Sequence, residues 1–576
     1  MTSGNDSHLL MRAFAQELGR CGIAGAVSSP GSRSTPLLLA LGRDGGFPVF
    51  SQVDERGAGF FALGLAKATG RPAVLVCTSG TAAANYLPAV IEAREARVPL
   101  IVCTADRPPE LRDVGAGQAI DQVKLYGDAV SMFVEVGVDH ADGPTTRWLR
   151  ELACRAVWTS LGPRPGPVHL NFPFREPLVP DGDLPADSEE TAGRPDGRPW
   201  TARVSVPPSG ERAAEVIAPV VEAAAHGVVV AGRIEDEDRE RLVRAAEAFT
   251  QASGWPVLAD ALSGLRTGEG AVAHYHALLG SEAFAAAARP AAVLRIGDLP
   301  TSKRLRSWLA GLDSVNVLLD PHGAWQDPDA TADLVLDAPA AATLEALAAA
   351  GGSGAGDWLG GWRSADDRAA TAIAGSLGDA LTDPRIALEL GSLLPPEATL
   401  LVASSLPVRD VENFFPRLAS PPRVLSNRGA NGIDGTIATA YGLAAGSPDP
   451  VVLLIGDVAF AHDVGSLLTA RRLGAPLTIV LVDNGGGGIF DGLAIAGEED
   501  IYEQHVLTPT GLDIPGVAEA FGLHLMEPTT LEEFDAAVAH GIESAGTQLV
   551  HVKTDRAGGL EARTAASRAV AAALSA

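Results

Sequence analysis

The sequence predicts an α/β protein that consists of three doubly wound domains. Short apolar runs rich in valine, isoleucine and leucine recur along the chain, and helix-length stretches separate them. Runs of this kind are typical of strands that are buried on both faces of a parallel sheet. Two polar stretches rich in glycine or proline, at 180–195 and 351–356, divide the chain into three parts. We therefore predict domains at 1–185, 200–350 and 365–576.

The first and third parts repeat one pattern. Residues 55–70 and 427–446 each begin with a polar residue and Arg-Gly-Ala, and both continue into a stretch of small residues. A loop and a buried strand follow in both parts, at 73–77 and 451–455. A shared α/β unit explains the repeat, and chance similarity between alanine-rich helices is the alternative. In the middle part we expect further strands at 228–232, 257–260, 293–297 and 315–319.

The composition argues against several classes of protein. The formal net charge of −27 disfavours binding to nucleic acid or to an acidic membrane surface. No run of about 18 apolar residues occurs, so we expect no membrane span. The first residues lack the basic-then-apolar order of a secretory signal. The cysteines are scattered in apolar surroundings, so we expect reduced thiols in a cytoplasmic protein. They are Cys21, Cys77, Cys103 and Cys154.

Polar side chains follow four successive strands expected in the first part. We expect these strands near 25–28, 49–53, 73–77 and 100–104. The carboxyl ends of parallel strands form one rim, and α/β proteins bind their ligands there. We therefore expect the residues behind these strands to contribute to one site. The candidates are Ser32, Arg33, Glu55 and Arg107.

In the third part, two strand ends offer oxygen ligands. The expected strand at 451–456 ends at Asp457, and the next strand ends before Asn484 and a run of four glycines. A carboxylate, a side-chain amide and the backbone carbonyls of the glycine turn are the hard ligands that Mg²⁺ prefers. Ordinary turn residues at the end of a parallel sheet are the alternative.

The segment Gly456-Asp457, followed by Asn484, resembles the motif by which thiamine-diphosphate enzymes hold their cofactor. The resemblance implies that Asp457, Asn484 and the carbonyl of Gly486 bind Mg²⁺ or Mn²⁺, which anchors the diphosphate. Many relatives have glycine and asparagine where this chain has Val458 and Asp483, but neither position is a supposed ligand. The implied cofactor contacts are Glu55, Ser405, Ile433, Gly456, Asp457, Val458, Asn484, Gly486 and Ile489.

The same resemblance gives each domain and two further residues a role. It makes the first domain pyrimidine-binding, the second a central nucleotide fold and the third diphosphate-binding. Glu55 would activate the cofactor through its pyrimidine ring nitrogen, a role that suits a half-buried carboxyl with a raised pKa. A first-turn carboxylate favoured by the helix dipole is the alternative. Ile433 would press the cofactor into a bent form, or it is a plain core isoleucine.

Cationic residues at strand ends and loops indicate the substrates. Arginine binds carboxylates well because its planar fork contacts two oxygens at once. A single surface arginine is usually only solvated, but several at one rim of a chain with a net charge of −27 favour substrates with several carboxylates. These cations are Arg33, Arg107, Lys303, Arg409 and Arg428.

Among thiamine-diphosphate enzymes, the chain looks like the menaquinone-pathway synthases that decarboxylate 2-oxoglutarate and add the succinyl unit to isochorismate. The matching strings are at 29–36, 54–57, 104–111, 118–120 and 426–435. The chain departs from that family at Gly117 and Ser404, where we expect asparagine. The resemblance makes Glu55, Gln118, Arg409 and Arg428 catalytic. It implies substrate contacts at Ser32, Arg33, Arg107, Gln118, Lys303, Arg409, Arg428 and Phe490.

The assembly and the competing functions follow from the same comparison. Thiamine-diphosphate enzymes build their sites between subunits, so we expect a homodimer or homotetramer. An acetolactate-synthase-type enzyme or a 2-oxo-acid decarboxylase is the alternative within the family, although residues 105–125 lack the histidines that simple decarboxylases often carry there. A nucleotide-binding regulator without catalysis would explain the sheets but not Glu55, Asp457 and Asn484 together.

Overall fold

The computed structural model describes residues 5–137, 140–204, 209–351 and 356–575. They fall into two compact units. The first unit comprises 1–205, 427–448 and 462–475, and the second comprises 206–426, 449–461 and 476–576. Most of the spacer expected at 351–356 lies outside the described residues. The domain boundaries given above therefore stay predictions.

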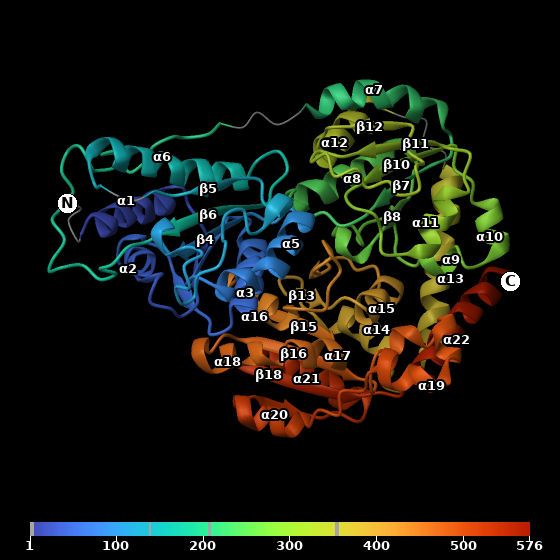
Figure 1. Cartoon of the computed structure of the whole chain (residues 1–576). Helices are drawn as coiled ribbons and strands as arrows, with labels where there is room; N and C mark the ends of the chain where they lie inside the picture. The colour runs from blue at the N-terminus through green and yellow to red at the C-terminus, as the bar shows by residue number, and fades with distance from the viewer. Residues whose placement is uncertain (1–4, 138–139, 205–208, 352–355, 576) are drawn as a thin grey trace. The chain divides into compact units, whose positions relative to one another are not determined.

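The first unit is built on one parallel sheet (Figure 1). Its strand order is β2 (Val49–Ser51), β1 (Gly25–Ser28), β3 (Ala73–Cys77), β4 (Leu100–Asp106), β6 (Pro167–Pro173) and β5 (Phe133–Glu135). One face packs against α1 (Asp6–Arg20), α2 (Thr35–Asp44) and α6 (Gly143–Ser160). The other face packs against α3 (Glu55–Thr69) and α5 (Leu87–Ala96). The sheet is therefore buried on both faces, as its apolar strands require.

Helix α16 (Thr436–Gly446) joins the first unit by packing along α3. A Cβ atom on Gly64 would lie 2.1 Å from the carbonyl oxygen of Thr439. A Cβ atom on Gly442 would lie 2.0 Å from the carbonyl oxygen of Phe61. Only glycine permits backbones to approach so closely. This packing attaches the segment before α16 to the same unit as α3.

The second unit contains two parallel sheets. The strand order of one is β12 (Leu334–Leu336), β11 (Val315–Leu319), β10 (Ala292–Ile296), β7 (Gly227–Ala231), β8 (Val257–Ala259) and β9 (Ala271–Val272). The order of the other is β14 (Arg423–Leu425), β13 (Thr399–Val402), β15 (Val451–Gly456), β16 (Leu477–Asp483), β18 (Thr547–Lys553) and β17 (His524–Met526). The expected architecture of three parallel α/β sheets is confirmed.

The internal repeat is seen in the strand order of two of the sheets. If β1 to β6 are matched in order to β13 to β18, the two sheets have the same spatial strand order. The repeated strands at 73–77 and 451–455 correspond to β3 and β15, at equivalent places in the two sheets. The sheet formed by β7 to β12 has a different order. Chance similarity of alanine-rich helices therefore does not explain the repeat.

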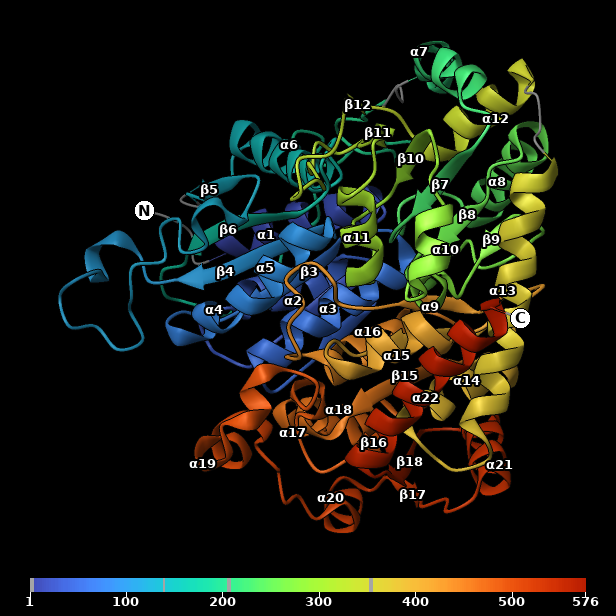
Figure 2. The same cartoon turned by 90° about the vertical axis from the view of Figure 1, so that its right-hand side faces the viewer.

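Two long helices of the second unit pack against each other. Helix α22 (Arg556–Ser575) runs beside α13 (Gly356–Leu377) (Figures 1 and 2). Ala566 and Val570 of α22 belong to the same apolar core as Trp362 of α13. Among the described helices, none combines the length and the apolar character needed to cross a membrane. All four cysteines are free thiols.

Candidate active site

Asp457 begins α17 (Asp457–His462) directly after β15. The backbone N–H groups of Val458 and Gly486 act to lower the pKa of this carboxylate. The residue is only 5% exposed, yet its Oδ2 has no hydrogen-bond partner among the described residues. Burial, with the nearby charge of Asp483, raises the pKa of Asp457 to about 6. Burying a carboxylate oxygen without a partner costs free energy, and a bound cation would offset this cost.

Asn484 follows β16, the neighbour of β15. Its Nδ2 donates a hydrogen bond to Asp383 Oδ2 at 2.9 Å, while its Oδ1 is buried without a partner in the described structure. The preceding Asp483 is engaged elsewhere, because its Oδ2 lies 3.1 Å from Nε2 of His551. That contact lowers the pKa of Asp483. Asp483, which departs from the usual family pattern, thus interacts with His551.

The glycine turn after Asn484 needs its glycines. Gly486 has a φ of +135°, and a Cβ atom on it would lie 2.6 Å from the carbonyl oxygen of Leu507. The Gly486 carbonyl accepts a hydrogen bond from Gly488 N at 2.9 Å and keeps a second lone pair. With the oxygens of Asp457 and Asn484 that have no partner among the described residues, this carbonyl would supply a donor set made only of oxygens. Such a set fits Mg²⁺ or Mn²⁺.

Glu55 is the first residue of α3, and Asp54 caps that helix by accepting a hydrogen bond from Arg56 N at 2.8 Å. The Glu55 carboxyl is half-buried. Burial, followed by the neighbouring charge of Asp54, raises the pKa of Glu55. This is the environment that a proton-exchanging carboxyl needs. The surroundings of Glu55 therefore suit the activating role. They also suit the alternative, in which Glu55 is a first-turn carboxylate favoured by the helix dipole.

The segment with Arg428 and Ile433 is fixed within the first unit. The backbone N–H groups of Gly429 and Ala430 donate to the two carboxylate oxygens of Glu92 at 2.8 and 2.6 Å. Ile433 is half-buried just before α16. Glu92 was not predicted, and a single glutamate within a helix gives no sequence signal for such a contact.

Arg33 and Arg107 lie near one another. The charge of Arg107, after burial, lowers the pKa of Arg33. Arg33 donates to the carbonyl of Phe174 at 3.0 Å and pairs with Glu176 at 3.0 Å. Nη1 of Arg107 is buried without a hydrogen-bond partner in the described structure. Nε of Arg33 likewise has no partner among the described residues, so two neighbouring guanidiniums, each with an unused donor, form a place for an anion. Ser32 beside them is exposed.

Gln118 lies on an exposed loop in the left-handed region, with a φ of +53°. Its carbonyl accepts a hydrogen bond from Ser79 Oγ at 2.8 Å, and the carbonyl of Gly117 accepts one from Arg107 Nε at 3.2 Å. Gln122 Oε1 also accepts from Gly80 N at 2.9 Å. The structure thus ties the Gln118 loop to the turn after β3. Sequence reasoning missed this role of Ser79, although the polar turn after that strand was a signal.

The predicted residues of the second unit lie at helix starts and in the glycine turn. Ser405 precedes α15 (Leu406–Phe414) with a φ of +74°, and its carbonyl accepts a hydrogen bond from Nη1 of Arg409. Lys303 is exposed at the start of α11 (Lys303–Ala310). Ile489 and Phe490 belong to the 3₁₀ helix after the glycine turn, and Phe490 is 36% exposed.

The predicted residues separate into two sets. The first unit contains Ser32, Arg33, Glu55, Arg107, Gln118, Arg428 and Ile433. The second unit contains Lys303, Ser405, Arg409, Gly456, Asp457, Val458, Asn484, Gly486, Ile489 and Phe490.

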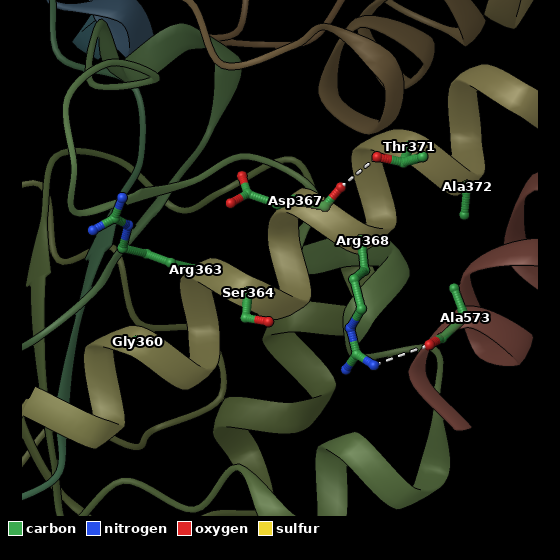
Figure 3. A pocket seen from close by; sticks show the side chains of 8 residues that line it. All are labelled: Gly360, Arg363, Ser364, Asp367, Arg368, Thr371, Ala372 and Ala573. Carbon is green, nitrogen blue, oxygen red and sulfur yellow. Dashed lines mark hydrogen bonds between the residues drawn. The ribbon is translucent and has the colours of Figure 1, made fainter. Parts of the chain in front are cut away.

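A pocket along α13 is lined by none of these residues (Figure 3). Arg368 donates to the carbonyl of Ala573 at 3.1 Å, and Thr371 donates to that of Asp367 at 3.0 Å. The pocket is lined by Gly360, Arg363, Ser364, Asp367, Arg368, Thr371, Ala372 and Ala573. None of them is a predicted site residue, so we assign this pocket no role.

Comparison with known families agrees with the fold. Residues 10–125 match the N-terminal TPP binding domain of thiamine pyrophosphate enzymes. Residues 198–402 match the middle domain of these enzymes, and residues 409–552 match their C-terminal TPP binding domain. The protein is thus a thiamine-diphosphate enzyme that works with a divalent metal ion.

Relatives that align with nearly the whole chain indicate which family of thiamine-diphosphate enzymes it belongs to. A 2-succinyl-5-enolpyruvyl-6-hydroxy-3-cyclohexene-1-carboxylate synthase of Halobacterium salinarum is 41% identical, over 96% of this chain and 97% of its own. A synthase of the same name from Myxococcus xanthus is 40% identical, over 96% of this chain and 96% of its own. Another from Bacillus velezensis is 39% identical, over 94% of this chain and 94% of its own. The chain belongs to the family of 2-succinyl-5-enolpyruvyl-6-hydroxy-3-cyclohexene-1-carboxylate synthases.

Proposed function

We propose that this enzyme decarboxylates 2-oxoglutarate on thiamine diphosphate and adds the remaining succinyl unit to isochorismate in a 1,4 sense. The products are CO₂ and 2-succinyl-5-enolpyruvyl-6-hydroxy-3-cyclohexene-1-carboxylate, an intermediate of menaquinone biosynthesis. The observation that carries the proposal beyond family membership is the pair Arg33 and Arg107, which have buried guanidinium nitrogens without a partner among the described residues. Two dicarboxylate substrates suit such cations.

We propose Asp457, Asn484 and the Gly486 carbonyl as the ligands of Mg²⁺ or Mn²⁺. Their support is the pair of buried oxygens on Asp457 and Asn484 that have no partner in the described part of the chain. When bound, thiamine diphosphate supplies the stabilisation of the carbanion equivalent that decarboxylation leaves. Further proposed cofactor contacts are Gly456, Val458, Ser405, Ile433 and Ile489.

The remaining roles concern protons and substrates. Glu55 would share a proton with the pyrimidine ring nitrogen, which its raised pKa favours. Gln118, Arg409 and Arg428 would contact the reacting substrates, and Phe490 would form an apolar wall. The residues that would orient the two dicarboxylates are Ser32, Arg33, Arg107, Gln118, Lys303, Arg409 and Arg428.

The direct test is an assay with both substrates. We expect isochorismate to disappear only when 2-oxoglutarate, thiamine diphosphate and Mg²⁺ or Mn²⁺ are all present. Ultraviolet absorbance follows isochorismate, and mass spectrometry identifies the product. Unchanged isochorismate under these conditions, with a protein that binds the cofactor, would contradict the proposal.

The choice of donor tests the arginines. Pyruvate lacks the distal carboxylate, so it should be a donor at least ten- to hundredfold poorer than 2-oxoglutarate. Loss of one charge-assisted contact from a dry site costs on the order of 1.5–3 kcal/mol. Arg409→Ala or Arg428→Ala should lower kcat/KM for the dicarboxylates by a similar factor and leave cofactor affinity nearly unchanged. If pyruvate proves equally good, an acetolactate-type activity replaces this proposal.

We also propose a homodimer or homotetramer with each site between subunits, in the cytoplasm, without nucleic-acid partners. Mixing Glu55→Gln and Asp457→Ala chains tests the shared site. In a hybrid dimer, one site would carry both changes and the other would carry neither. Random exchange should therefore restore about a quarter of wild-type activity. Native mass spectrometry verifies the exchange, and no recovery among verified hybrids would refute the shared site.

A further inference from the structure

The side-chain amide of Asn484 is held by a group that can only accept hydrogen bonds. Asp383 Oδ2 lies 2.9 Å from Asn484 Nδ2. An ionised carboxylate has no donor, so only the NH₂ end of an amide can face it. The oxygen end of Asn484 then faces the other way, and this Oδ1 is buried and finds no partner among the residues that the structure describes. The carboxylate of Asp383 thus decides which end of Asn484 is left for a ligand.

Asp383 is itself rigidly placed. It is 7% exposed and is the first residue of α14 (Asp383–Leu393). Its Oδ1 accepts a hydrogen bond from Thr554 Oγ1 at 2.6 Å, just after β18. Its Oδ2 also accepts from Nη2 of Arg563 at 3.2 Å. Both oxygens are therefore occupied, which prevents the carboxylate from turning away from Asn484.

Arg563, on α22, connects this carboxylate to a second one. Its Nε and Nη2 donate to Oδ1 and Oδ2 of Asp410 at 2.7 and 2.6 Å, a bidentate pair. Asp410 is buried in α15 and is the neighbour in sequence of Arg409, a proposed substrate contact. One guanidinium thus fixes both the support of Asn484 and the helix that carries Arg409.

We infer that Asp383 is a positioning residue for the metal of the cofactor. It presents Oδ1 of Asn484, rather than Nδ2, to the metal, and Arg563 keeps Asp383 in place. The inference rests on the proposed role of Asn484 as a metal ligand and does not depend on the identity of the substrates. Residues that hold a metal ligand in place commonly matter for affinity, because their loss weakens metal binding by roughly 10–100-fold.

The test measures Mn²⁺ binding directly, by electron paramagnetic resonance of free Mn²⁺ with thiamine diphosphate present and the full-length protein. Asp383→Ala leaves the Asn484 amide free to turn, so its dissociation constant for Mn²⁺ should rise by about 10–100-fold. Asp383→Asn keeps an oxygen that can accept from Asn484, so it should restore much of the affinity. Thr554→Val is the graded comparison: it removes one of the two bonds that hold the carboxylate but keeps Asp383, its bond from Arg563 and its contact with Asn484, so it should weaken Mn²⁺ binding clearly less than Asp383→Ala does.

Further variants separate the possible failures. If Asn484→Ala and Asp457→Ala both bind Mn²⁺ as wild type does, the metal assignment fails. If those two weaken binding and Asp383→Ala does not, only the positioning role is wrong. Should Asp383→Ala not fold, Arg563→Lys replaces it, because lysine keeps the charge but cannot hold two carboxylates with a planar fork. Unchanged Mn²⁺ affinity in folded Arg563→Lys would then overturn the part assigned to Arg563.

Discussion

Replacing Glu55 by glutamine is expected to lower kcat by about 10²–10⁴-fold, the usual contribution of a proton-transferring side chain. Glutamine has nearly the same shape and keeps an oxygen acceptor, but it cannot exchange a proton. Burial of the half-buried carboxyl raises the pKa of Glu55, which favours its protonated form more than in an exposed glutamate. Steady-state turnover measures the loss, and quenching of protein fluorescence by thiamine diphosphate shows whether the cofactor still binds.

The neighbouring Asp54 provides the control for this substitution. Asp54→Asn keeps an acceptor for Arg56 N and so preserves the helix cap, while it removes one charge beside Glu55. We expect a small effect on kcat. If Asp54→Asn and Glu55→Gln reduce kcat equally, the effect comes from the start of α3, and Glu55 has no special role. Wild-type turnover by Glu55→Gln would remove it from the mechanism.

The sequence was most informative where local chemistry determines structure. Buried parallel strands must be apolar on both faces, so β15 and β16 could be recognised from composition alone. The polar residues that directly follow these strands, Asp457 and Asn484, could be located in the same way, although their role as metal ligands stays a prediction. The short strands β9 and β12 were not predicted, and neither were the longer strands β6 and β18.

Other features depend on folding and left no local trace. Asp383 lies far from Asn484 in sequence, and only the fold brings its carboxylate to the amide. The left-handed backbone of Gln118 could not be foreseen, because non-glycine residues adopt it rarely and without a fixed neighbour pattern. The role of Asp483 was likewise hidden until its contact with His551 was seen.

Removing the Asp457 carboxylate should nearly abolish metal-dependent binding of the cofactor without harming the fold. Its Oδ2 is buried and has no hydrogen-bond partner in the described structure, so the metal-free protein bears the cost of burying it. We therefore expect Asp457→Ala without cofactor to unfold at the wild-type temperature or slightly above. Wild type should gain about 2.7 kcal/mol when Mg²⁺ and thiamine diphosphate are present at 100 times the dissociation constant, and the variant should gain almost nothing.

Thermal unfolding of both proteins, with and without metal and cofactor, measures these quantities. Asp457→Asn separates charge from shape, because it keeps an oxygen ligand and loses the negative charge. We expect its cofactor-induced shift to lie between those of wild type and Asp457→Ala, since Mg²⁺ gains most from an anionic oxygen. A full wild-type shift in Asp457→Ala would mean that the metal is held elsewhere. A variant that unfolds far below wild type without cofactor would instead show that Asp457 stabilises the end of β15, and the unpartnered Oδ2 would then need another explanation.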